Sequence, residues 1–253
     1  MKNRPGLSVI SLSAAALSLF LLGGCNRSGS DSDAANPTSN SAEPASAGNT
    51  VTGKDDKTPK VQHFDNIIEM HEGRLKDNYV DFSFDFPFAW EYKGEGGKPE
   101  NRNFIRVENS LKDAKKGEFT LENFAVGALK LKTAQARTPQ NLGTAAMLYS
   151  KNLAMKWPAY REVSRGPVKI NNYPGYEVRY QMSHSGTKRG KVAIFGRIIL
   201  LPAPKGLNGV LLLMSASSLA KDIKSAADVG VKGELPVILK SFKFTDKKDK
   251  KDP

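Results

Sequence analysis

Hydrophobic and polar residues alternate along several stretches between residues 61 and 245, and a period of two predicts β-strands. The alternation is clearest in residues 81–86, where three phenylalanines are separated by Ser83 and Asp85 and would form one buried face. The same reasoning predicts strands at 104–108, 124–131, 176–182, 192–201 and 210–216. The last two ranges are apolar on both faces, apart from Arg197, which is typical of strands in the middle of a sheet.

One amphipathic helix is predicted between Thr138 and Trp157. Thr138 is a good N-cap residue, Pro139 suits the first helical position, and Pro158 ends the pattern. Between them, apolar residues recur at spacings of three and four and form one stripe: Leu142, Ala146, Tyr149, Leu153 and Trp157.

The remaining local signals are weaker. They predict a second helix at about 234–240, a short helix near 63–71, a turn at 172–175 ahead of the strand that starts at Tyr176, and a polar hairpin loop at 183–190. The order of elements is therefore strands, a helix, more strands and a helix. This order favours the α+β class, an antiparallel sheet covered by helices. Residues 61–245 have the size of one globular domain.

Five short motifs along this domain, taken in order, resemble the PsbP-like superfamily: Phe86–Trp90, Glu108–Ser110, Thr138–Pro139, Asn172–Tyr176 and Ile238–Phe242. The resemblance implies an α/β/α sandwich around an antiparallel sheet. It implies no single activity, although members with assigned roles mostly bind other proteins. The matching residues Pro87, Trp90, Gly175 and Phe242 suggest structural roles: a turn, a core indole, a turn glycine and a closing aromatic.

The N-terminus resembles that of bacterial lipoproteins. Lys2 and Arg4 precede an uncharged run of sixteen residues, which is short for a permanent membrane span, and Gly23 and Gly24 lead to Cys25. This pattern predicts a signal peptide at 1–24 and lipid attachment at Cys25. The alternative is an ordinary secretory signal followed by a chance cysteine.

In a Gram-negative host, the resemblance to lipoproteins bears on the target membrane. An Asp after the cysteine resembles an inner-membrane retention signal, and this chain has Asn26. We therefore expect a protein of the cell envelope that is anchored in the outer membrane and faces the periplasm.

Two polar segments flank the expected domain. Residues 26–60 are rich in small and polar residues, with Val51 as the only large aliphatic residue, so we expect a disordered linker. A flexible chain of this length has a root-mean-square span of about 30–35 Å. Residues 246–253 are expected to form a charged, disordered tail.

No set of residues with catalytic or metal-ligand spacing is apparent. Cys25 is the only cysteine, so the domain has no thiol, and the three histidines have no paired spacing. His184 has serine neighbours, but neighbours in sequence do not make a triad. Asp81 and Asp85, with Glu91 and Glu95 nearby, leave a cation site open as an alternative to a solvated strand face. We expect no enzyme activity, no cofactor and no metal.

Positive charge is concentrated in the middle of the chain. Residues 130–221 contain fifteen basic residues and only two acidic ones, Glu162 and Glu177. A field of one sign attracts partners of the opposite sign. The residues proposed to contact a partner are Lys151, Lys156, Arg161, Arg165, Lys188, Arg189 and Lys191. The alternative is a general solubility effect without a partner.

The sequence thus predicts a non-catalytic, lipid-anchored protein that binds a protein or an anionic envelope polymer through a basic surface. Nucleic acid is not expected as a partner, since no recognised module is present. A carrier or sensor of an apolar small ligand is the alternative function. The oligomeric state is left open.

Overall fold

A seven-stranded antiparallel sheet forms the centre of the computed structural model, which describes residues 60–93, 103–187 and 190–245. Its strand order is β3-β4-β5-β9-β8-β7-β6. The strands are β3 (Glu91–Tyr92), β4 (Asn103–Asp113), β5 (Gly117–Lys130), β6 (Arg161–Ile170), β7 (Tyr173–Thr187), β8 (Gly190–Pro202) and β9 (Asn208–Ser217). β8 and β9 lie in the interior of the sheet, as their apolar faces predicted.

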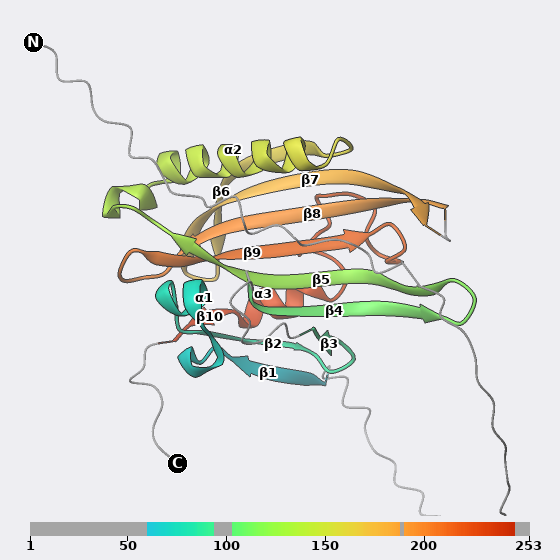
Figure 1. Ribbon diagram of the computed structural model, residues 1–253, viewed down its shortest axis with the longest axis horizontal. Coiled ribbons are helices and arrows are strands. Elements are labelled where there is room, and N and C mark those ends of the chain that lie inside the picture. The colour runs from blue at the N-terminus through green and yellow to red at the C-terminus, as the bar shows by residue number, and fades with distance from the viewer. Residues whose placement is uncertain (1–59, 94–102, 188–189, 246–253) are drawn as a thin grey trace, which may run out of the picture.

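Helices and a smaller sheet cover the two faces of this sheet (Figure 1). Helix α2 (Pro139–Lys156) lies on one face, over β6 and β7. The other face carries α3 (Leu235–Ser241) and a three-stranded sheet of β1 (Val61–Asp65), β2 (Phe82–Pro87) and β10 (Lys243–Phe244). The short helix α1 (Gly73–Asp77) and the 3-10 turns Ile68–Met70 and Ala134–Arg137 complete the described elements. The predicted fold class, an antiparallel sheet covered by helices, is confirmed.

Helix α2 forms for the local reasons that the sequence indicated. The Thr138 hydroxyl accepts a hydrogen bond from the backbone N–H of Asn141 at 3.4 Å, and Pro139 occupies the first turn. The predicted stripe points into the core: Leu142, Ala146, Tyr149 and Leu153 are all buried. The helix ends at Trp157, directly before Pro158.

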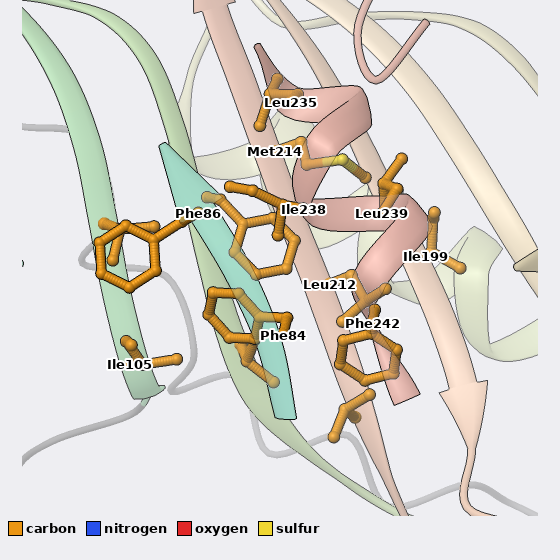
Figure 2. Packing of buried hydrophobic residues seen from close by; sticks show 14 of the residues in the cluster. Phe84, Phe86, Ile105, Ile199, Leu212, Met214, Leu235, Ile238, Leu239 and Phe242 are labelled. Carbon is orange, nitrogen blue, oxygen red and sulfur yellow. The ribbon is translucent and has the colours of Figure 1, made fainter. Parts of the chain in front are cut away.

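The core is divided by the sheet into two main clusters. One fills the space beneath α2 and includes Ala125, Leu129 and Val178. The other lies on the opposite face, where α3 packs between β2 and the central strands (Figure 2). In that view Ile238 of α3 and Phe242, the residue directly after the helix, point toward Phe84 and neighbouring side chains. Burial of each large apolar side chain contributes about 1.5–3 kcal/mol, so both faces hold the fold together.

The predicted helix near residues 63–71 is wrong. Residues 61–65 form β1, whose Phe64 is buried and pairs with Phe84 of β2, while His63 and Asp65 on either side are exposed. This is a period of two, and the helical part of residues 63–71 is limited to a single 3-10 turn, Ile68–Met70. Pairing with a strand twenty residues later outweighed the weak helical pattern.

Two predicted connections also differ from the structure. The turn is at Asn171 and Asn172, where Asn171 has a φ of 52°, and Tyr173 already belongs to β7. Gly175 is therefore a strand glycine rather than a turn glycine, and a Cβ there would approach Leu200 O to 2.6 Å. The predicted loop at 183–190 is mostly strand, because β7 runs to Thr187 and β8 starts at Gly190.

Strand β6 was not predicted from the sequence. It is the edge strand of the large sheet, and its side chains are mostly exposed or half-buried, with only Ile170 buried. Without a buried face there is no alternating pattern to detect. Its Pro167 and its charges are features that protect natural sheet edges from further pairing.

Candidate binding surfaces

The outward face of α2 combines exposed apolar groups with a cation. Lys151 is three residues after Leu148 and four before Met155, so the three side chains share one face of the helix. All three are exposed, and Met155 retains 77% of its accessible surface. Because α2 contains no acidic residue, nothing on the helix itself neutralises this positive charge.

The predicted partner-binding residues of β6 point to different sides of the sheet. Residues directly opposite each other in an antiparallel pair share a face. Arg165 is opposite Val178, whose side chain is buried beneath α2, so Arg165 lies on the α2 side. Arg161 is opposite Gln181, which alternates with the α2-facing Tyr180, and therefore points to the other side.

Ionic contacts already reduce the charge of one predicted residue. Arg165 Nε lies 2.6 Å from Glu162 Oε1, and the same carboxylate accepts a hydrogen bond from Ser150 of α2. Lys156 is exposed in the last turn of α2. Lys191 is exposed near the start of β8, and Lys188, Arg189 and Cys25 lie outside the described residues. The structure thus brings Lys151, Lys156 and Arg165 to one side of the sheet and separates Arg161 from them.

Two arginines between residues 130 and 221 make contacts inside the domain that stabilise the fold. Glu177 accepts from Arg179 Nε at 2.9 Å and from Arg197 Nε at 2.7 Å. Arg179 also donates to the carbonyl of Ala226 at 2.8 Å and so holds the loop after β9 against the sheet. Burial lowers the pKa of Arg197, but a guanidinium keeps its charge at any physiological pH. Arg179 and Arg197 are therefore not available to a binding surface.

A buried carboxylate anchors α3 to the sheet. Glu122 of β5 is 3% exposed and accepts from the backbone N–H of Glu234, at 3.2 Å to its nearer oxygen. Burial raises the pKa of Glu122 to about 7, and the nearby charges of Glu234 and Asp222 add to this shift. Glu234 in turn accepts from Trp90 Nε1 at 2.5 Å, which confirms Trp90 as a core indole. The only sequence signal for Glu122 was an acid at the start of an apolar run.

The acidic side of β2 is occupied by hydrogen bonds. Asp85 lies 2.5 Å from His63 Nδ1, and Asp81 accepts from the Tyr79 hydroxyl at 2.9 Å. Ser83, between them, is completely buried, so the strand has no simple solvated face. In the parts of the chain that the structure describes, no group of three or more His, Cys, Asp or Glu side chains could hold a metal ion. Glu95 lies outside those parts.

A cleft of about 180 Å³ opens where the large sheet extends past the C-terminal end of α2. Trp157, together with Pro158 and Ala159, forms the side next to the helix. Ile194 of β8 and Met182 of β7 contribute apolar surface. Hydroxyl and imidazole groups complete the lining: Thr120, Ser183, His184, Ser215 and Ser217. No local pattern in the sequence indicates this cleft, because its residues come from four strands and a helix end.

The lining residues of this cleft do not form a Ser-His-acid triad. Ser183 and His184 are adjacent in β7, so their side chains leave the strand in opposite directions. No carboxylate stands among the lining residues to orient the imidazole of His184. What the cleft offers is apolar surface next to several hydroxyl groups.

None of the helices within the described residues is both long enough and apolar enough to cross a membrane. The predicted signal peptide, Cys25 and the predicted linker up to residue 59 lie outside these residues.

No protein-family model and no curated protein matches the sequence. Similar solved structures include cyanobacterial PsbP from Synechocystis sp. PCC 6803, at 11% identity and a TM-score of 0.42, covering 78% of this chain and 99% of that one. LpqN of Mycobacterium tuberculosis, described as involved in cell envelope biogenesis, is 12% identical with a TM-score of 0.43, covering 74% and 92%.

The Ran-binding protein Mog1p of Saccharomyces cerevisiae is 12% identical with a TM-score of 0.41, covering 76% of this chain and 98% of that one. At these identities and TM-scores, the similarities assign no ligand, partner or activity to this chain.

Proposed function

We propose that this protein is a non-catalytic, lipid-anchored binding protein of the cell envelope. In this proposal Cys25 carries the anchor, residues 26–60 form the linker, and the domain docks a protein or an anionic envelope polymer. The docking surface is the outward face of α2. The observation that supports it is the exposure of Leu148, Lys151 and Met155 on a helix without acidic residues.

This surface has the composition of a docking site. Interfaces are enriched in Met and aromatic residues relative to the rest of the surface, and a flexible thioether adapts to irregular contacts. Lys151 would attract an acidic partner and orient it, while Met155 and Leu148 would supply buried apolar area. Lys156 lies on the same side of the sheet as Lys151 and adds positive charge, whereas the charge of Arg165 is paired with Glu162.

The linker gives the domain reach. Anchored at Cys25, a flexible segment with a span of about 30–35 Å would let α2 search the space next to the membrane without detaching. Tethering raises the effective concentration of the domain near membrane-bound partners, so a weak individual contact is sufficient.

The proposal is tested by photo-crosslinking in intact envelopes. A photoreactive residue is placed at position 155 on α2, and a matched control is placed at Val231, which is 60% exposed in the loop beneath the opposite face. We expect adducts from position 155 and none from 231. Raising ionic strength from about 0.1 M to 1 M shortens the Debye length from about 10 Å to 3 Å and should reduce the yield.

Lys151→Glu should reduce the adduct further, because it reverses the one charge at the centre of the face. Equal amounts of adduct at positions 155 and 231 would reject the electrostatic docking surface. So would an adduct yield at position 155 that changes neither with salt concentration nor with Lys151→Glu.

The alternative of a carrier with its ligand between sheet and helices loses its original support. The apolar residues that suggested it are buried against one another in the two main core clusters.

A further inference from the structure

The cleft at the end of α2 contains a buried hydroxyl group that has no hydrogen-bond partner. Ser217, in the last position of β9, is 2% exposed, and its Oγ makes no hydrogen bond in the structure. Leaving a buried polar group unsatisfied costs about 1–3 kcal/mol, so such groups in a native fold require an explanation. Because Ser217 lines the cleft, a bound ligand is one group that can satisfy it.

The position of Ser217 in β9 is unusual for its strand. From Val210 to Met214 the strand is apolar, and then Ser215 and Ser217 take the two positions that face the cleft. Residues two apart on a strand share a face, and the same face carries the core residues Leu211 and Leu213 further along. Along this face of β9, the side chains thus change from apolar beneath α2 to hydroxyl-bearing beyond the end of the helix.

Apolar side chains flank these hydroxyls. Met182 of β7, Ile194 of β8 and Ser217 of β9 lie in one row on the same face of the sheet, because Ile194 pairs directly with both of the others, and Trp157 lies at the end of the helix. The indole, thioether and aliphatic groups together can pack against one face of a ring. The volume of about 180 Å³ is sufficient for a single ring, since a cavity of about 150 Å³ in another protein holds benzene.

Charge on the ligand is disfavoured. No Asp, Glu, Lys or Arg lines the cleft, and His184 is its only titratable side chain. The cleft adjoins the C-terminal end of an 18-residue helix, where the helix dipole is negative and repels anions. A cationic ligand would lose its hydration on entering the cleft and would find no carboxylate among the lining residues to pair with.

We propose that this cleft binds an uncharged ligand of about one ring that carries a hydroxyl or amide group. The apolar part lies against Trp157, Met182 and Ile194, and the polar group hydrogen-bonds to Ser217. The proposal does not depend on the outward face of α2, because the cleft residues and Lys151, Leu148 and Met155 are different sets.

The test is a titration followed by backbone amide NMR, with the full chain carrying Cys25→Ser. Three probes of equal ring size are used: cyclohexanol, cyclohexanecarboxylate and cyclohexylammonium. We expect cyclohexanol to shift the amide signals of Trp157, Ile194 and Ser217 saturably at millimolar concentration. The two charged probes should bind about tenfold more weakly or not at all, because they lose hydration without gaining a partner.

Ser217→Ala should weaken cyclohexanol binding about fivefold, which corresponds to the loss of one neutral hydrogen bond. Since the variant removes an unpaired group, we expect it to fold at least as well as the parent. Ser185→Ala, at an exposed position of β7 outside the cleft, is the matched control and should leave binding unchanged.

The proposal is overturned if cyclohexanol produces no saturable shift at the cleft residues. It is equally overturned if all three probes bind alike, or if Ser217→Ala and Ser185→Ala bind cyclohexanol as the parent does.

Discussion

At the scale of single residues, the fold depends on polar groups that are buried and paired. Glu177 forms ion pairs with two arginines on one side of the sheet, and Glu122 accepts hydrogen bonds from the backbone at the start of α3 on the same side. Removing one partner of a buried charged group leaves the other uncompensated, which destabilises proteins by several kcal/mol. Such residues therefore control stability, although they resemble surface residues in the sequence.

Glu122 makes the stability of the domain depend on pH. Its pKa is about 7 in the folded protein against 4.5 ordinarily, so the folded state holds the proton more tightly. The stabilisation is complete below pH 4.5 and is lost as pH rises through 7. Glu122→Gln stays neutral at every pH. Between pH 4.5 and pH values above 7, we therefore expect its free energy of unfolding to fall less than that of the parent, by up to about 3 kcal/mol.

The measurement is urea unfolding of both proteins at several pH values. Glu72→Gln, at an exposed position, is the control. Stability curves for the parent and Glu122→Gln that run parallel across this pH range would refute the assignment.

At the scale of elements, adjacent strands approach closely where a glycine leaves room for an aromatic ring. Tyr180 of β7 is paired with Gly196 of β8, and its buried ring lies over that glycine and stacks on Tyr160, with centroids 5.2 Å apart. A Cβ at position 196 would lie 2.0 Å from the ring. This contact fixes the ring beneath α2 and so helps to position the helix.

Gly196→Ala should therefore destabilise the domain by about 1–3 kcal/mol or more, because the ring must leave its place in a packed core. For a domain of this size, 1 kcal/mol corresponds to a fall in Tm of about 2–4 °C. Gly166→Ala in the edge strand β6 is the matched control, since a Cβ there meets nothing within 4 Å. Thermal unfolding followed by circular dichroism compares them, and similar Tm values for the two variants would contradict the packing argument.

At the scale of the whole molecule, the proposed membrane attachment depends on the N-terminal segment. No described helix can cross a membrane, and the uncharged run that leads through Gly23 and Gly24 to Cys25 is the feature of the sequence that predicts an anchor. Two or more acyl chains hold a protein on a membrane stably, whereas a single chain binds only marginally.

Cys25→Ser should abolish labelling of the protein by a fatty-acid analogue and move the domain to the soluble fraction. Asn26→Ser, one residue later, is the control and should be labelled as the parent is. Fractionation of cells followed by immunoblotting gives the distribution. Membrane attachment that persists in Cys25→Ser would exclude a lipid anchor at this position.

Patterns local in sequence predicted the local structure well. Thr138, Pro139 and the apolar stripe defined α2, and continuous apolar runs identified β8 and β9, because caps and periodicity act within a few residues. The edge strand β6 was missed because it lacks a buried face, and the turn predicted at 172–175 begins one residue earlier, at Asn171, because Tyr173 already belongs to β7. The helix expected near His63 failed because pairing with β2 decided the conformation of that segment.

By itself the sequence determined the fold class, the position of α2 and the concentration of positive charge between residues 130 and 221, since each depends on residue types along a continuous stretch. Only the tertiary structure decided which charges are available. It buried Arg197 against Glu177, turned Arg161 away from α2 and left Lys151 beside Met155. It also assembled the cleft around Ser217 from four strands and a helix end. Contacts between residues far apart in the chain depend on strand order and register, which no single stretch of sequence encodes.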